Sequence, residues 1–183
     1  MTRNQKTALI VAGIVVILIV ASPKTAEKIA LNIPGVKQLY RASVAKKVVD
    51  QWGALVTQIS FPYQEAVPPE YVLAIICQES GGDPNAQNPS DPSRGLMALT
   101  PGALSDVNRY LGTSYTFDQL YDPTINVTCG CEYIYRRYMR WKDYRTALAA
   151  YNAGDGNTTA GASYADSVMQ YLQAVLDYSK QIS

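Results

Sequence analysis

The glutamate Glu79 follows an apolar run over residues 71–76 and precedes two glycines, Gly81 and Gly82. A buried carboxylate without a partner is costly, and it responds by taking up a proton. A carboxyl group that is protonated near neutral pH is what a general acid requires, so this stretch predicts acid–base chemistry at Glu79. The same pattern also fits a glutamate that points into water at the end of a helix.

The composition excludes several other kinds of site. The 183 residues include no histidine, which excludes Ser-His-Asp and Cys-His arrangements and metal sites that need imidazole. The 16 basic residues against 15 acidic ones give no case for a nucleic-acid partner. Cys77, Cys129 and Cys131 are too few and too irregularly spaced for a zinc ribbon or a disulfide scaffold. We therefore expect carboxylate chemistry with no metal and no cofactor.

An uninterrupted apolar run covers residues 8–21, after Arg3 and Lys6. The run is short for a membrane-spanning helix, which needs about 20 apolar residues, and it has the length of a signal-peptide core. We expect a retained anchor that contacts the membrane through residues 7–22, with a cleaved signal peptide as the alternative. Both interpretations place the rest of the chain on the periplasmic or other extracytoplasmic side.

The remainder of the chain predicts helices joined by polar loops. Apolar residues at three- and four-residue steps indicate an amphipathic helix over residues 36–59, and Pro69 opens the helix that ends at Glu79. Start and stop signals predict the later helices from Thr100-Pro101 to near Gly112, from Asp122-Pro123 to about Arg140, over residues 144–151, and from a cap at Ser163 to Ile182.

The sequence shows no alternating strand pattern and no internal repeat, so we expect an all-α fold with little or no β structure. The expected organisation is a membrane-directed segment over residues 1–24, a tether and helix start over 25–44, and a single small globular domain over 45–183.

Four stretches resemble the lytic transglycosylases and their goose-type lysozyme relatives. In chain order these are AIICQESGGDPNA, RGLMALTPGAL, DPTINVTCGCEYI and ALAAYNAGDG. They are similar to the helix with the family's catalytic glutamate, the Gly-Leu-Met stretch beside the glycan, the supporting helix, and the Ala-Tyr-Asn-Ala-Gly signature. Their order and spacing agree over residues 48–172. The resemblance implies a lysozyme-like fold and peptidoglycan glycan strands as the partner.

The resemblance also implies a mechanism. Glu79 would protonate the oxygen of the β-1,4 bond between N-acetylmuramic acid and N-acetylglucosamine. The N-acetyl group of the substrate would act as the internal nucleophile, so that no second enzyme carboxylate is needed, unlike in two-carboxylate glycosidases. The ionised Glu79 would then take the proton of the sugar's 6-hydroxyl, which closes a 1,6-anhydro ring.

Other roles follow from the resemblance position by position. The implied substrate-binding residues are Ser80, Asn88, Gly95, Met97, Tyr151 and Asn152. Tyr151 is the first of these, because its hydroxyl is expected near the glutamate and the substrate. Gly95 would let the backbone approach a ligand closely. The other five have a structural alternative: Ser80 caps the helix, Asn88 and Asn152 form turns, and Met97 and Tyr151 belong to the core.

The chain departs from the family at two places. Ala98 stands where glutamine is common, which puts one hydrogen bond to substrate or glutamate in doubt. Cys129 and Cys131 occupy positions that usually hold small residues. In an oxidising compartment Cys77 can pair with one of these two, which leaves an odd thiol.

Two rival functions stay open. A muramidase would deliver water, with Asp83 or Asp91 as the first candidate to position it, and a non-catalytic protein would bind peptidoglycan in an assembly. The intact Glu79-Ser80 pair argues against the non-catalytic alternative. Cell-wall remodelling, a secretion or conjugation apparatus and a membrane-containing phage virion all fit a small anchored enzyme.

Overall fold

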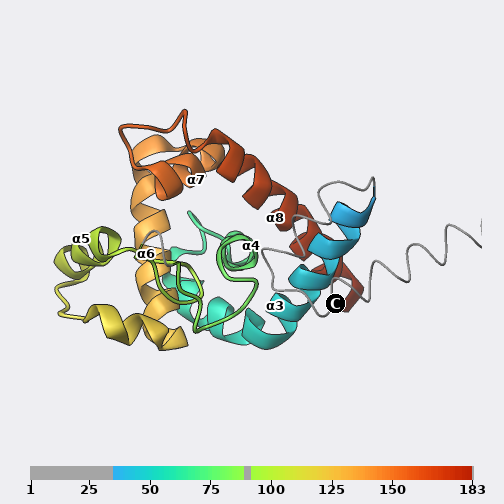
Figure 1. Ribbon diagram of the computed structural model, residues 1–183, viewed down its shortest axis with the longest axis horizontal. Helices are drawn as coiled ribbons and strands as arrows, with labels where there is room; N and C mark the ends of the chain where they lie inside the picture. The colour runs from blue at the N-terminus through green and yellow to red at the C-terminus, as the bar shows by residue number, and fades with distance from the viewer. Residues whose placement is uncertain (1–34, 89–91, 183) are drawn as a thin grey trace, which may run out of the picture. The chain divides into compact units, whose positions relative to one another are not determined.

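The computed structural model describes residues 35–88 and 92–182, and helices make up its regular structure (Figure 1). The α-helices are α3 (Val36–Ser60), α4 (Pro69–Glu79), α5 (Pro101–Leu111), α6 (Pro123–Trp141), α7 (Tyr144–Ala153) and α8 (Ala162–Ile182). Two short 3-10 helices, η1 (Phe61–Tyr63) and η2 (Phe117–Tyr121), lie between them. Within the described residues the β pairing is limited to isolated bridges from Arg94 to Gln87 and to Leu99. The predicted all-α fold is confirmed.

The chain divides into two compact units, Met1–Ser43 and Val44–Ser183. The apolar run at residues 8–21 lies outside the described residues, so the expected membrane contact and the expected domain boundaries stay predictions. Across residues 35–88 and 92–182, every helix is too short or too polar to span a membrane.

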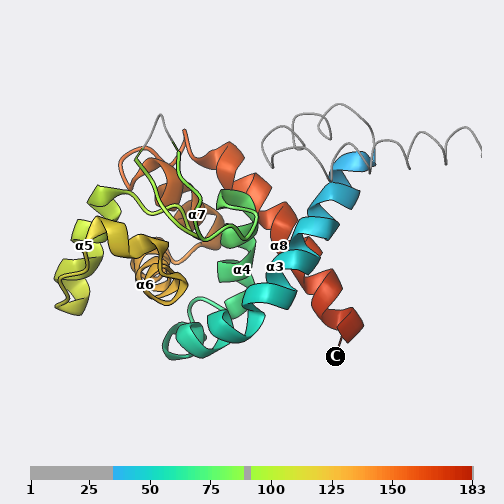
Figure 2. The same ribbon diagram turned by 60° about the horizontal axis from the view of Figure 1, so that its bottom comes forward.

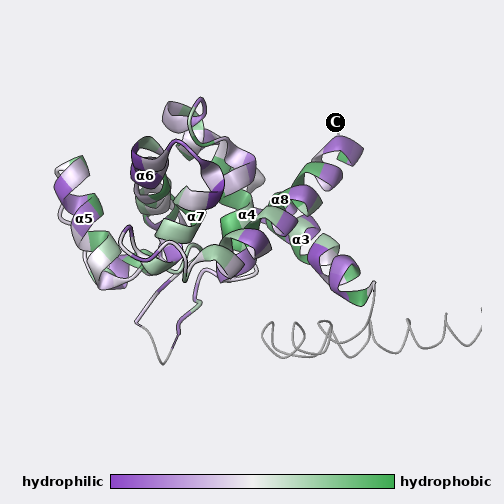
Figure 3. Cartoon of the chain, turned by 90° about the horizontal axis from the view of Figure 1, so that it is seen from above, coloured by the Kyte–Doolittle hydropathy of each residue, from purple (hydrophilic) through white to green (hydrophobic). Residues whose placement is uncertain are grey.

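Helix α4 forms the middle of the second unit. Its six consecutive residues 72–77 are buried, which means that neighbouring helices cover it on every side. Figure 1 shows α4 nearly end-on among the other helices, and Figure 2 shows it beside α3 and α8 from a second direction. Helix α4 packs against α8, and α7 packs against both α6 and α8. Figure 3 shows that α4 is largely hydrophobic, as a central helix must be.

Local capping explains where two of the helices begin. The Thr100 side chain accepts a hydrogen bond from the Ala103 backbone N–H at the start of α5 (3.2 Å). The Asp122 carboxylate accepts two, from the Thr124 and Ile125 backbone N–H groups, at the start of α6 (2.8 and 3.0 Å). The predicted starts of both helices are confirmed, and their ends lie within two residues of the predicted positions.

The predicted cap at Ser163 is wrong. Helix α8 begins at Ala162, so Ser163 lies inside its first turn. The carbonyl of Gly161 accepts the first helical hydrogen bond, from the Ala165 N–H (3.0 Å). A Cβ at Gly161 would lie 2.2 Å from the carbonyl oxygen of Ala149 on α7, so only glycine fits this close contact between helices.

Candidate active site

Glu79 is the last residue of α4, and its side chain is half-buried. The chain turns sharply behind it, because the backbone N–H groups of Ser80 and Gly81 both donate to the carbonyl of Ile76 (3.1 Å each). Gly81 and Gly82 have left-handed backbones, with φ of +59° and +83°. The buried helix thus ends by placing a carboxyl group at its boundary, as the sequence predicted.

Ser80 closes this helix end with its side chain. Its hydroxyl donates to the Ile76 carbonyl (3.2 Å) and accepts from the Gly82 N–H (3.1 Å). The side chain is also buried. These contacts favour the helix-capping alternative for Ser80 over direct contact with a substrate.

Helix α3 holds the glycine turn from the other side. The ammonium of Lys47 donates to the Gly81 carbonyl (2.9 Å), and the indole N–H of Trp52 donates to the Gly82 carbonyl (3.1 Å). A Cβ at Gly82 would lie 3.1 Å from a methyl group of Val48, whereas a Cβ at Gly81 would meet no described atom within 4 Å. The open side of the turn therefore lies at Gly81, next to the Glu79-Ser80 pair.

Tyr164, which the sequence analysis did not single out, contacts Glu79 directly. Its hydroxyl donates to Oε1 of Glu79 across 2.6 Å from the first turn of α8. Tyr164 lies on the same helical face as the buried residues Val168, Tyr171 and Val175, and this periodicity was the available signal that it faces inward. The periodicity does not identify the partner, which lies 85 residues earlier in the chain.

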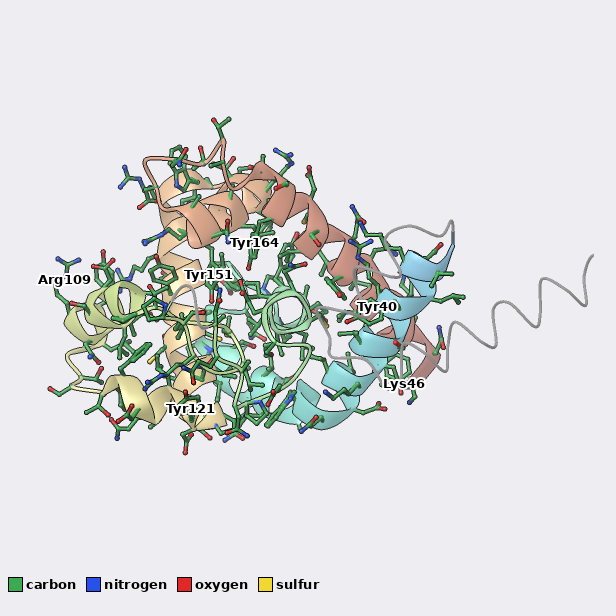
Figure 4. All side chains as sticks on the ribbon, in the orientation of Figure 1. Tyr40, Lys46, Arg109, Tyr121, Tyr151 and Tyr164 are labelled. Atoms are coloured by element: carbon green, nitrogen blue, oxygen red, sulfur yellow. The ribbon has the colours of Figure 1, made fainter. Side chains whose placement is uncertain are left out.

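Tyr151 lies beside Tyr164, as Figure 4 shows, but its hydroxyl has another partner. The Tyr151 hydroxyl donates to the carbonyl of Met97 (2.6 Å) and is buried. Its ring is nearly parallel to that of Tyr164 (centroids 6.4 Å apart, 9° between planes) and meets Tyr133 edge-on (5.3 Å). Tyr151 thus reaches the region of the glutamate while bonding to the Gly-Leu-Met turn.

Burial, and next the negative charge of Glu79, raise the pKa of both Tyr151 and Tyr164 well above the usual tyrosine value. Both phenols therefore keep their protons at neutral pH and act as hydrogen-bond donors.

The turn at residues 95–98 is built on Asn126 of α6. The Asn126 side-chain oxygen accepts from the Met97 N–H (2.8 Å), and its amide group donates to the carbonyls of Arg94 and Leu120 (2.9 Å each). The Met97 side chain is 0% exposed and packs on Gly130, where a Cβ would lie 2.1 Å from its sulfur. Complete burial of the Met97 side chain favours the core alternative over contact with a substrate.

Gly95 also has a structural reason to be glycine. Its φ is +79°, and a Cβ there would lie 2.2 Å from the Asn126 amide nitrogen and from the Leu120 carbonyl oxygen. Gly95 thus permits a close approach to Leu120 of η2 and Asn126 of α6, and its predicted approach to a ligand stays a prediction. Ala98, where the resemblance implies glutamine, completes the turn with φ of +46° and is half-buried.

The two asparagines differ in exposure. Asn152 lies on α7 and is exposed, whereas Asn88 is half-buried in the loop, where its backbone N–H donates to the Ser93 carbonyl (3.4 Å). Of the predicted substrate-binding residues, these two have side chains that reach the surface in part or in full.

Cys77, Cys129 and Cys131 are free thiols, and all three are buried. The pairing that the sequence left open is therefore absent from the structure. The cysteines fill core positions on α4 and α6.

The chain is similar to known proteins of one family. The family model described as the Transglycosylase SLT domain matches residues 59–172. The chain is 37% identical over 93 residues to the soluble lytic murein transglycosylase of Escherichia coli K12. These residues make up 49% of this chain and 14% of that protein. It is 29% identical over 132 residues to the transglycosylase of Enterobacteria phage PRD1, covering 70% of this chain and 46% of that one. The chain thus spans less than half the length of these curated relatives.

Solved structures show the same fold. An inactive Glu-to-Gln mutant of lytic transglycosylase Slt from Pseudomonas aeruginosa matches with a TM-score of 0.59 and 20% identity, over 78% of this chain and 30% of that one. The 70 kDa soluble lytic transglycosylase of Escherichia coli matches with a TM-score of 0.58 and 20% identity, over 83% and 32%. Because the family model covers more than half of the sequence, the chain belongs to the transglycosylase SLT domain family.

Proposed function

We propose that this protein is a peptidoglycan lytic transglycosylase in which Glu79 is the single general acid and base. The observation that carries the proposal is the position of Glu79 in a chain of this family. Its carboxyl group lies at the end of a buried helix, next to the open side of a glycine turn. The family match and the likeness to the soluble lytic murein transglycosylase support peptidoglycan as the substrate.

Glu132, the glutamate that is fully buried among the described residues, is less suited to transfer a proton to a substrate. Glu132 on α6 is 2% exposed, and its carboxylate accepts from the Arg136 guanidinium across 2.6 Å. A carboxyl group buried to this extent does not reach a surface where a substrate could bind. Glu79 is therefore the preferred acid.

The first step breaks the glycosidic bond. Glu79 gives its proton to the bridging oxygen, which leaves with the electron pair of the bond to the anomeric carbon. The carbonyl oxygen of the substrate's N-acetyl group attacks that carbon, so the enzyme needs no second carboxylate. Glu79 is left ionised.

The second step releases the product. The ionised Glu79 takes the proton of the 6-hydroxyl, whose oxygen displaces the N-acetyl oxygen and closes the 1,6-anhydro ring. The hydroxyl is tethered to the reacting sugar, and this proximity favours it over water. We propose that Asn88 and Asn152 contact the glycan at the surface. Ser80, Gly95 and Tyr151 are proposed to stabilise the backbone around the site without direct contact with the glycan.

Residues 7–22 are proposed to anchor the enzyme so that it acts outside the cytoplasmic membrane. The apolar run at residues 8–21 supports this, and the match to a phage transglycosylase supports a phage envelope among the settings that the sequence left open. Membrane fractionation with N-terminal sequencing tests the anchor. A mature N-terminus near Ser22 in the soluble fraction would show that the segment is a cleaved signal peptide and not an anchor.

Lysis of purified cell-wall sacculi by Glu79→Gln tests the catalytic role. General acid catalysis contributes ~10²–10⁴-fold, and one group serves both proton transfers here, so the loss is expected at or beyond the upper end. Glu70→Gln is the matched control, because Glu70 lies in the first turn of the same helix. Both variants are expected to keep the wild-type unfolding temperature within a few degrees. A folded Glu79→Gln protein that keeps its activity would contradict the proposed role of Glu79. The protein would then be a muramidase that uses another acid, or an enzyme with a different chemistry.

A further inference from the structure

Two side chains of α3 complete the hydrogen bonds of the glycine turn at residues 80–82. The three N–H groups of the turn donate to the Ile76 carbonyl and to the Ser80 hydroxyl, and the Ser80 carbonyl accepts from the Asp83 N–H (3.2 Å). The two glycine carbonyls then remain, and both accept from donors on α3. Every N–H and carbonyl group of the turn thus has a partner within the protein.

The bonds from α3 restrain a backbone that glycine leaves free to move. Gly81 and Gly82 both have positive φ, and a glycine backbone has the widest conformational range of any residue. A Cβ at Gly81 would meet no described atom within 4 Å, so packing does not restrain this side of the turn. The ammonium of Lys47 and the indole N–H of Trp52 therefore restrain the segment that directly follows Glu79.

The part of α3 that carries these donors is itself fixed. Ala45, Val48 and Val56 are each 0% exposed, and together with Trp52 they recur at three- and four-residue steps along one face of the helix. Figure 2 shows this helix beside α4. The two donors thus belong to a packed helix and not to a loop, which makes their positions precise.

The resemblance to known proteins assigns no role to either donor. Lys47 and Trp52 precede residues 59–172, which the family model matches. They also lie outside the four stretches that carry the sequence resemblance, which begin at Ala74.

We propose that Trp52 and Lys47 are positioning residues for the active site, which act through the glycine turn. By holding the carbonyls of Gly82 and Gly81, they keep the carboxyl group of Glu79 in one position while the glycan reacts. The proposal rests on the proposed function of Glu79. One group performs both proton transfers there, and a misplacement of about 1 Å can reduce a rate by about a hundredfold.

Trp52→Phe is the main test, because it removes the indole N–H and keeps an aromatic ring. The maximal rate of sacculus lysis is expected to fall about ten- to a hundredfold. The half-saturating sacculus concentration is expected to stay unchanged, because Trp52 makes no contact with the glycan in this proposal. Amide hydrogen exchange at residues 80–83, measured by NMR, is expected to become faster than in the wild type.

Trp141→Phe is the matched control. The indole N–H of Trp141 donates to the Asp155 carboxylate (2.9 Å), and Trp141 is half-buried like Trp52. The control loses the same donor and the same part of the ring at another place. It is expected to keep the wild-type rate and the wild-type exchange at residues 80–83. Equal rate losses in the two variants would overturn the proposal, because general destabilisation would then explain both.

Lys47 provides a second test that does not depend on the folding of Trp52→Phe, because its side chain is exposed. Lys47→Met is expected to lower the maximal rate about three- to tenfold, the effect of one net hydrogen bond. Lys47→Arg keeps a donor and is expected to restore the rate. Lys46→Met is the control, because the neighbouring Lys46 ammonium bonds to Asp50 and Tyr178 (2.7 Å each) and not to the turn.

Each residue can lose its assigned role separately. A wild-type rate in Lys47→Met, or an equal loss in Lys46→Met, would overturn the role of Lys47. A wild-type rate in Trp52→Phe, or failure of that variant to fold, would overturn the role of Trp52. A raised half-saturating concentration with the wild-type maximal rate would overturn the positioning role of either residue, because its side chain would then contact the glycan.

Glu79→Gln, measured in parallel, separates this proposal from the proposed function. An active Glu79→Gln enzyme overturns both. An inactive Glu79→Gln enzyme, together with wild-type rates in Trp52→Phe and Lys47→Met, overturns the positioning role alone.

Discussion

The hydroxyl of Tyr151 donates to the carbonyl of Met97 across 2.6 Å, although 54 positions separate the two residues in the chain. This bond joins α7 to the turn at residues 95–98, and Asn126 holds the same turn from α6. The Ala-Tyr-Asn-Ala-Gly and Gly-Leu-Met stretches are thus joined by a buried hydrogen bond.

Tyr151→Phe is expected to reduce the stability of the protein more than its activity. The change leaves the buried Met97 carbonyl without the donor that Tyr151 supplies, which costs about 1–3 kcal/mol in the free energy of unfolding. Urea unfolding and sacculus lysis, normalised to folded protein, measure the two effects. A stable variant with a large loss of activity would show instead that Tyr151 acts directly on substrate.

Gly95→Ala is expected to disrupt the fold. A Cβ there would lie 2.2 Å from the backbone oxygen of Leu120, which cannot move without breaking the turn, so the cost should exceed about 4 kcal/mol. Gly112→Ala is the control, because Gly112 is also left-handed (φ +66°) but a Cβ there meets no described atom within 4 Å. Its cost should be about 1–2 kcal/mol, that of the backbone strain alone. Equal costs in thermal unfolding would show that the close contact with Leu120 in η2 is unimportant.

The three cysteines are expected to be unreactive in the folded protein. Burial raises the pKa of Cys129 to about 11 and that of Cys131 to about 12, and it also raises the pKa of Cys77. The thiolate is the reactive form, so a thiol reagent at neutral pH should modify the native protein very slowly. Unfolding in denaturant without reductant should release three reactive thiols. Recovery of one thiol would instead demonstrate a disulfide.

The sequence predicted most of the helices because their boundaries are set locally. Thr100 and Asp122 cap the helices that follow them, and each needs only neighbouring backbone N–H groups to do so. The same is true of Glu79, whose place at the end of a buried helix follows from an apolar run and two glycines. Ser163 misled the prediction because packing of Gly161 on α7, and not a side-chain cap, determines where α8 begins.

The partners of the site residues depend on contacts between distant segments. Tyr164 reaches Glu79 only because α8 packs against α4. Met97 is buried because Gly130 leaves room for its side chain, and the sequence alone does not indicate that pairing. The roles of Met97 and Tyr164 thus required the three-dimensional structure.

The most direct test of the central claim is mass spectrometry of the muropeptides released from sacculi in heavy-oxygen water. Internal capture by the 6-hydroxyl gives 1,6-anhydro products that are lighter by one water and carry no heavy oxygen. Wild-type protein is expected to yield these products first, and Glu79→Gln to yield none. Reducing muropeptides that carry the heavy oxygen as the main initial products would contradict the account and identify the protein as a muramidase.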